Sequence, residues 1–216
     1  MRAKAQDDFL AIGLTLKSFY IGNMKPSEKS AEELRALARS LGSGEESLLL
    51  RAKATETTVK RMDLSQHRVI AFATHGFLAG EIKGVAEPSL LLTPPAEATE
   101  LDDGVLTASE ISQLKLNSDW VILSACNTAG PEGTGAGQGL SGLARAFFMA
   151  GAKSLLVSHW PVVSVAAQRL TTGMFSELSK DKGIRKAEAL RRAMKATMND
   201  SSIPFSNHPA VWAPFV

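Results

Sequence analysis

Two residue types that together perform nucleophilic catalysis stand at the ends of apolar segments in this sequence. His75 follows the apolar segment 68–74, and Cys126, the one cysteine of the chain, follows the apolar segment 120–124. A cysteine attacks as its thiolate, and a neighbouring imidazole promotes the thiolate by taking up its proton. The two residues are 126 − 75 = 51 positions apart, close to the spacing of about 50 that accompanies a caspase-type nucleophile. The sequence therefore predicts a catalytic pair of His75 and Cys126.

Peptide cleavage also needs hydrogen-bond donors where the carbonyl oxygen becomes an oxyanion. Gly76 lets a backbone N–H come close to a substrate, and the N–H of Cys126 is expected to be the second donor. Residues beside these groups, or at the end of a further apolar segment, are the candidates for substrate contact: Thr74, Ala125, Ser158 and Trp160. For Trp160, packing in the core is an equal alternative.

The elements that must position these residues follow an alternating pattern. Short apolar segments alternate with stretches of helical periodicity, which is typical of β-α units around a mostly parallel sheet. Strands are expected at 9–14, 47–51, 68–74, 89–93, 120–124 and 154–158, helices at 27–41, 55–62, 107–114, 139–150, 163–179 and 184–198, and an edge element at 210–216. Ligands bind beyond the carboxyl ends of parallel strands, so His75 and Cys126 are expected to face one crevice.

Composition limits the classes of protein that fit. The 216 residues carry 24 Lys and Arg against 22 Asp and Glu, a net charge of +2, with 44% hydrophobic residues. We expect one globular domain and no direct nucleic-acid or membrane partner, because such partners usually require a strongly basic face or tail. A single cysteine forms no internal disulfide and no zinc cage, so we expect a cytoplasmic protein without a metal or other cofactor.

Other motifs favour weaker alternatives. Residues 137–142 fit the dinucleotide-binding pattern G-x-G-x-x-G, but about a dozen residues separate them from the preceding strand and no acidic residue follows for a ribose. The loop acids Asp102, Asp103 and Glu132 are interpreted as solvated rather than as part of a substrate pocket. The basic residues around 185–195 are interpreted as a solvated helix face, and His67, His159 and His208 as structural.

Several segments together resemble the CHAT domain, a caspase-like family related to separases and caspases and often attached to tetratricopeptide repeats. These segments are Phe72–Gly76, Leu123–Thr128, Gly139–Gly151, Ser158–Val162 and His208–Val216. The resemblance runs from about residue 8 to the end. Residues 1–216 are therefore expected to form one CHAT-like domain, and because family domains commonly extend further upstream, a domain cut from a longer chain is an open alternative.

The resemblance implies a caspase–hemoglobinase-like fold, a three-layer α/β sandwich with a mostly parallel central sheet and helices on both faces. It also implies a cysteine endopeptidase whose dyad falls on His75 and Cys126, whose oxyanion donors fall on Gly76 and Cys126, and whose partners are a protein or peptide substrate and a regulatory repeat segment. A catalytically silent interaction module of the same fold, in a repeat-associated signalling or defence assembly, is the alternative. Family members usually carry acidic residues after the Trp-Pro-Val stretch, whereas Val163, Ser164 and Val165 stand here, so no substrate charge is carried over.

Overall fold

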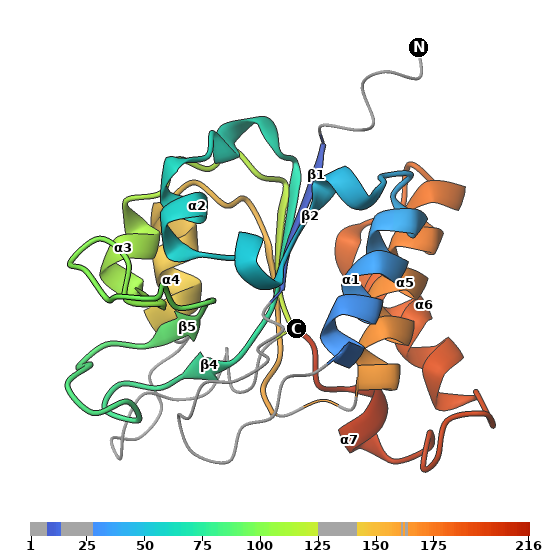
Figure 1. Ribbon diagram of the computed structural model, residues 1–216. Helices are drawn as coiled ribbons and strands as arrows, with labels where there is room; N and C mark the ends of the chain where they lie inside the picture. Colours follow the sequence, from blue (N-terminus) through green and yellow to red (C-terminus); the bar gives the residue numbers. More distant parts are fainter. Residues whose placement is uncertain (1–7, 14–27, 125–141, 161, 163) are drawn as a thin grey trace.

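The central feature of the computed structural model is a five-stranded parallel sheet with helices on both faces (Figure 1). The structure describes residues 8–13, 28–124, 142–160, 162 and 164–216. The strand order is β2-β1-β3-β7-β8. Their bounds are β1 Phe9–Gly13, β2 Leu48–Leu50, β3 Val69–Ala73, β7 Trp120–Leu123 and β8 Leu155–Val157. These strands were predicted because their residues are almost continuously apolar, as expected for strands covered on both faces.

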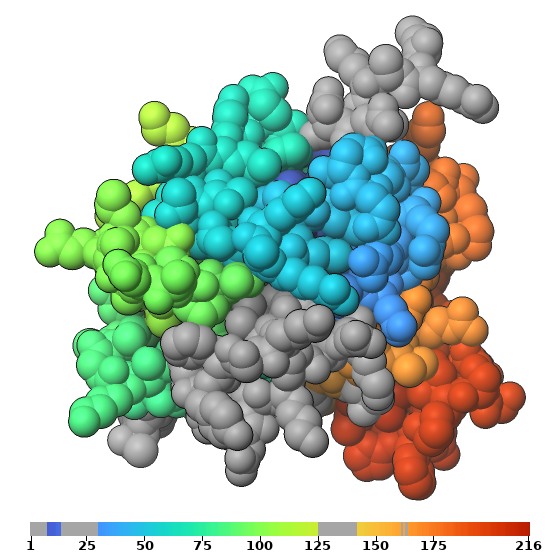
Figure 2. All heavy atoms as spheres, viewed as in Figure 1, coloured from blue at the N-terminus to red at the C-terminus, as the bar shows by residue number. Residues whose placement is uncertain are grey.

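Two groups of helices cover the two faces of the sheet. On one side lie α1 Glu28–Ser40, α5 Ser164–Lys180 and α6 Lys186–Met198, and on the other lie α2 Glu56–Arg61, α3 Ala108–Ser112 and α4 Gly142–Met149 (Figure 1). All six were predicted to within about three residues at each described end. Viewed as atoms, α1 and the segment from β2 to α2 lie side by side on one surface (Figure 2). None of the helices among the described residues combines the length and apolar character needed to cross a membrane.

The side chains of the central strands alternate between two cores. Phe72 of β3 packs against Phe147 of α4, with ring centroids 5.4 Å apart, in the core beneath α2, α3 and α4. Trp120 of β7 packs against Phe175 of α5, with centroids 5.9 Å apart, in the core beneath α1, α5 and α6. Both cores therefore meet at β3 and β7, the two strands that precede the predicted catalytic residues.

A second, antiparallel sheet of three short strands lies beyond the end of β3. Its strands are β4 Gly76–Phe77, β5 Ser89–Leu91 and β6 Val105–Thr107. Only β5 was predicted, because it lies in a continuous apolar segment, whereas β4 and β6 are defined by their pairing with β5. Three 3₁₀ turns complete the described chain before β3: η1 Glu45–Ser47, η2 Arg51–Lys53 and η3 Leu64–Gln66.

The C-terminal tail forms both a helical turn and an edge pairing. Helix α7 spans Pro209–Trp212, where the sequence predicted an edge element throughout 210–216. The pairing holds for the last residues, since Ser158 bridges Phe215 in antiparallel orientation and Val157 and Val216 exchange two hydrogen bonds of 3.0 Å. The tail therefore closes the outer edge of β8.

Candidate active site

The strand β5 holds the chain where it leaves β3. The Thr74 hydroxyl donates a hydrogen bond to the Leu91 carbonyl, and the Leu91 N–H donates to the His75 carbonyl at 2.9 Å. Thr74 is only 9% exposed. Thr74, one of the residues expected to contact substrate, has its hydroxyl hydrogen-bonded within the protein next to His75.

The pairing of β4 with β5 determines where the Gly76 N–H points. Gly76 lies opposite Leu90, and the neighbouring pairs, His75 with Leu91 and Phe77 with Ser89, are the hydrogen-bonded ones. In an antiparallel ladder, a residue between two hydrogen-bonded pairs turns its N–H and C=O away from the partner strand. The Gly76 N–H therefore points away from β5 and is not used in the pairing of β4 with β5.

His75 is half-buried, and burial lowers the pKa of its imidazole below the ordinary value. Burial disfavours the charged form of a histidine, because an imidazolium loses more hydration than a neutral ring. At neutral pH the ring is therefore mainly neutral. A neutral imidazole can accept a proton from a thiol or from water.

The two central strands leave the sheet level with each other. Val69 pairs with Trp120 and Phe72 with Leu123, so partners in β3 and β7 differ by 120 − 69 = 51 in number. The pairing continues one step further, because the Ser124 N–H donates to the Phe72 carbonyl at 2.8 Å. The same difference of 51 separates His75 from Cys126 in the sequence. Ala125 and Cys126 lie outside the described residues.

The third strand end is covered by the tail. Ser158 is 1% exposed and bridges Phe215, so it lies within the sheet rather than on an open surface. Trp160 is half-buried, and its indole N–H donates to the Ala210 carbonyl at 3.1 Å. The structure thus ties Trp160 to the tail, and it brings neither residue together with His75 through any described contact.

The whole chain also matches a known family. A sequence model described as the CHAT domain matches residues 2–216. The chain belongs to the CHAT family. The resemblance seen in the sequence segments is thereby confirmed.

Curated relatives of this CHAT domain include much longer proteins. Tetratricopeptide repeat protein 28 of Mus musculus is 35% identical over 120 residues, and the Homo sapiens protein of that name is 34% identical over 121 residues. Each match covers 56% of this chain but only 5% of the relative. The CHAT domain thus corresponds to a small part of those proteins.

A solved structure supports the fold. The complex of the pro- and mature domains of Porphyromonas gingivalis RgpB matches with a TM-score of 0.52 and 10% identity, over 96% of this chain and 47% of that one. At this identity the likeness concerns the fold alone. The predicted caspase–hemoglobinase-like sandwich, with its mostly parallel sheet, is confirmed.

One buried acid near the site was not predicted from the sequence. Glu33 of α1 is 5% exposed, and its carboxyl is hydrogen-bonded to the Ser124 side chain. Burial raises the pKa of Glu33 to about 7, although the Ser124 hydrogen bond acts to lower it. The sequence could have indicated this burial, because Glu33 lies four residues before Leu37 and therefore on the same, buried face of the helix.

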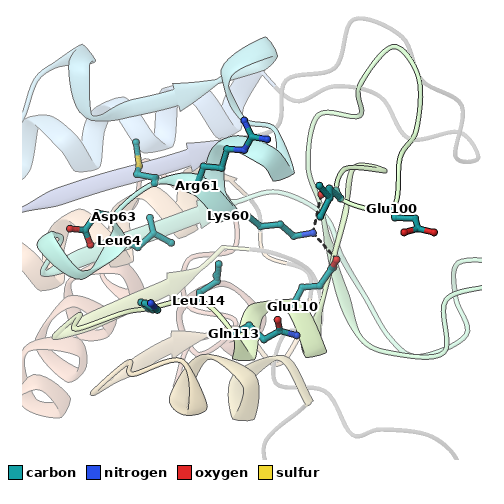
Figure 3. A pocket seen from close by; sticks show the side chains of 11 residues that line it. Lys60, Arg61, Asp63, Leu64, Glu100, Glu110, Gln113 and Leu114 are labelled. Carbon is teal, nitrogen blue, oxygen red and sulfur yellow. Dashed lines mark hydrogen bonds and ion pairs between the residues drawn. The ribbon is translucent and has the colours of Figure 1, made fainter.

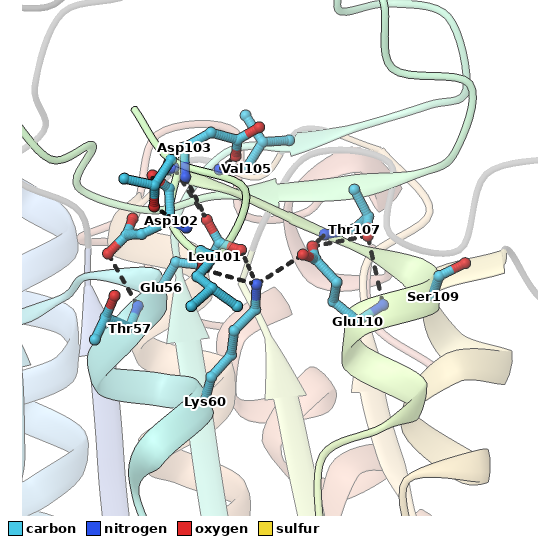
Figure 4. A network of polar contacts seen from close by, with 12 residues as sticks. Glu56, Thr57, Lys60, Leu101, Asp102, Asp103, Val105, Thr107, Ser109 and Glu110 are labelled. Atoms are coloured by element: carbon cyan, nitrogen blue, oxygen red, sulfur yellow. Dashed lines mark hydrogen bonds and ion pairs between the residues drawn. The ribbon is translucent and has the colours of Figure 1, made fainter. Parts of the chain in front are cut away.

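A polar network ties α2 to α3 and to the turn before β6 (Figure 4). Lys60 forms ion pairs with Glu56 and with Glu110, the latter at 2.7 Å, and donates to the Leu101 carbonyl at 3.0 Å. Glu56 also accepts hydrogen bonds from the backbone N–H groups of Asp103 and Gly104, at 2.9 and 3.1 Å. The network holds the segment that returns to β6 and is a structural clasp.

A cleft of about 730 Å³ lies beside this network (Figure 3). Lys60, Arg61, Leu101, Glu110 and Leu114 are among its lining residues, and neither His75 nor its neighbours line it. The lining mixes cations, anions and apolar groups, which specifies no ligand. Within the described residues, no three histidine, cysteine, aspartate or glutamate side chains gather to hold a metal ion.

The remaining polar candidates have structural contacts. Asp102 is buried and accepts from the Thr57 N–H at 3.1 Å, which corrects its interpretation as a solvated loop charge. Asp103 accepts from the Val105 N–H at 2.8 Å. His208 accepts from the Ala210 N–H at 3.2 Å and caps α7, as its structural interpretation predicted. Glu132 and most of the glycine motif 137–142 lie outside the described residues.

Proposed function

We propose that this CHAT domain is a cysteine endopeptidase that hydrolyses peptide bonds of a protein substrate. The observation that carries the proposal is the pairing of β3 with β7, whose offset of 51 equals the separation of His75 from Cys126. Neighbouring parallel strands that end level with each other deliver the residues that follow them to one edge of the sheet. The outward N–H of Gly76 supports the same assignment, because it lies next to the proposed base.

The proposed reaction has two stages. His75 takes the thiol proton, and the Cys126 sulfur attacks the peptide carbonyl carbon, while the N–H groups of Gly76 and Cys126 bind the oxyanion. The C–N bond then breaks as His75 gives its proton to the leaving amine, which leaves a thioester on Cys126. In the second stage His75 takes a proton from water, the hydroxide oxygen attacks the thioester, and the C–S bond breaks. The carboxylic acid product and the thiol, which regains the proton from His75, complete the cycle.

A repeat segment is the proposed regulatory partner. The curated relatives are named for tetratricopeptide repeats, and this chain corresponds to only a small part of them. We therefore propose that a repeat segment regulates the peptidase activity. Peptidase activity should be measured with the isolated domain alone and again with a repeat segment added. The substrate sequence is left to the experiment.

An unbiased fluorogenic peptide library tests the proposal. Wild-type protein should cleave some members, and Cys126→Ala and His75→Ala should each lower turnover by more than about a thousandfold. His67→Ala, a histidine at the opposite end of β3, is the matched control and should leave turnover unchanged. If no cleavage depends on Cys126, with the repeat segment present or absent, the peptidase proposal fails and the non-catalytic interaction module takes its place.

A further inference from the structure

Arg51 has a backbone conformation that residues with a side chain rarely adopt. Its φ is +54°, in the left-handed region that favours glycine, and it directly follows Leu50, the last residue of β2. Its carbonyl oxygen accepts two hydrogen bonds, from the Ala54 N–H at 2.9 Å and from the Thr93 hydroxyl at 2.7 Å. Strained residues that their surroundings hold in place occur most often at functional sites. The side chain of Arg51 is therefore a candidate for a function.

The register of the central sheet places Arg51 at the same edge as His75. Gly13 of β1 pairs with Leu50 of β2 on one side and with Ala73 of β3 on the other, so these two strands end level with each other. Arg51 comes directly after Leu50, and His75 comes two residues after Ala73. Neighbouring strands lie about 4.8 Å apart, so the ends of β2 and β3 are separated by about 10 Å along this edge.

The segment that holds the backbone at His75 also holds the backbone at Arg51. The Leu91 N–H donates to the His75 carbonyl at 2.9 Å. Two residues later, the Thr93 hydroxyl donates to the Arg51 carbonyl, and the Thr93 N–H donates to the Ala54 carbonyl at 2.9 Å. One short segment thus ties the turn that carries Arg51 to the turn that carries the proposed base.

Arg51 and Lys53 are cations without an acidic partner in the part of the chain that the structure describes. Both residues are exposed, and both lie in the 3₁₀ turn η2. Lys60, the next cation along the chain, is by contrast paired with Glu56 and Glu110. Two positive charges of this kind attract an anionic group, and a guanidinium can bind a carboxylate through two parallel hydrogen bonds.

We propose that Arg51, assisted by Lys53, is a specificity-determining residue that binds an acidic side chain of the peptide substrate. The proposal rests on the proposed peptidase function, since it names the class of substrate for the same site. An extended peptide advances about 3.3 Å per residue, so the separation of about 10 Å between the strand ends corresponds to about three residues. We therefore expect the acidic residue of the substrate within about four residues of the bond that is cleaved.

Matched pairs of fluorogenic peptides test this specificity. The two peptides of a pair have Glu or Gln at one position near the cleaved bond and are otherwise identical. The variants are Arg51→Met, which keeps a long apolar side chain without the charge, and Arg51→Gly, which adopts the same φ without strain. Arg39→Met, which removes an exposed cation from the last turn of α1, is the matched control.

Wild type should cleave the Glu peptide with a kcat/KM at least about tenfold above that of the Gln peptide, mainly through a lower KM. Both variants of Arg51 should bring this ratio close to one, and Arg39→Met should leave it unchanged. The Tm of Arg51→Gly should be no lower than that of wild type, so its loss of preference would not result from unfolding. Cleavage by wild type without a preference for Glu, or a preference that both variants retain, would overturn the proposal while the peptidase function stands.

A second measurement needs no substrate. Cys126 is the one cysteine of the chain, so the ratio of its alkylation rate with anionic iodoacetate to that with neutral iodoacetamide reports the electrostatic potential at its thiol. At an ionic strength of about 10 mM, the double variant Arg51→Met/Lys53→Met should lower this ratio by about twofold, and Arg39→Met should not change it. If wild type cleaves no peptide, the proposed function fails and this ratio alone decides the role of Arg51. A fall in the ratio then supports an anion-binding surface, and equal ratios overturn it.

Discussion

Replacing Glu33 by glutamine should flatten the pH dependence of folding stability. The pKa of this carboxyl is raised from 4.5 to about 7 by burial, so the folded chain holds a proton that the unfolded chain releases. Between these two values the folded state binds more protons, and the free energy of unfolding therefore falls as the pH rises. The stabilisation that comes from the proton bound to Glu33 is fully present below about pH 4.5 and is lost by the time the pH has passed about 7.

The magnitude follows from the difference between the two pKa values. The shift is 7 − 4.5 = 2.5 pH units, and at about 1.4 kcal/mol for each unit this corresponds to about 3 kcal/mol. Glutamine fills a similar volume and has no proton to release. The stability of Glu33→Gln minus that of wild type should therefore grow by about 3 kcal/mol between about pH 4.5 and about pH 8.

Urea unfolding followed by tryptophan fluorescence measures this difference, because Trp120 lies buried in the core beneath α1, α5 and α6. Other carboxylates also titrate in acid, but they are common to both proteins and cancel when the two free energies are subtracted. Glu32→Gln should show no such trend, since Glu32 is exposed on the same helix. A constant difference between Glu33→Gln and wild type across this pH range would refute the assignment of Glu33 as a carboxyl that is protonated when buried.

Three further changes should lower the free energy of unfolding. Lys60→Met leaves the Glu56 carboxylate, whose side chain is only 2% exposed, without its cation and should cost about 2 kcal/mol in urea unfolding, so an unchanged midpoint would contradict the clasp. Thr107→Ala removes the capping box of α3 and should cost about 1 kcal/mol, whereas Thr107→Ser should retain most of it. Gly151→Ala places a Cβ 2.3 Å from the Leu116 carbonyl oxygen at a φ of +109° and should cost more than about 1 kcal/mol, with a lowered Tm as the measurement.

The sequence predicted the strands and helices whose own residues indicate their structure without reference to other parts of the chain. Segments such as Val69–Ala73 and Trp120–Leu123 are apolar throughout, so their burial follows from composition, and Thr107 with Glu110 marks a helix start by itself. The strands β4 and β6 were missed because pairing with β5, rather than their own residues, defines them. Ser158 was expected near substrate because it ends an apolar segment, and its pairing with Phe215 could not be predicted because it joins segments distant in the sequence.

Only part of the candidate site could be predicted from the sequence, because some of its residues are brought together by tertiary packing. His75 and Cys126 were recognised from their types, spacing and segments, and the β3–β7 offset of 51 gives that spacing a physical reason. Glu33 could be placed on a helix, but its contact with Ser124 depends on how α1 packs across the end of the sheet. A sequence pattern that marks the buried side of a helix does not show which strand residue meets a given position.

The two strands that precede the proposed dyad residues are supported at their ends from different layers of the molecule. On one side, β5 fixes Thr74 and the His75 carbonyl, and β5 contributes to the core beneath α2, α3 and α4. On the other side, α1 reaches Ser124 through Glu33, and α1 belongs to the opposite core. The hydrogen bonds of these two supports share no side chain, and the pairing of β3 with β7 joins the two strand ends. The described ends of β3 and β7 are therefore held from opposite faces of the central sheet, β3 through β5 and β7 through α1.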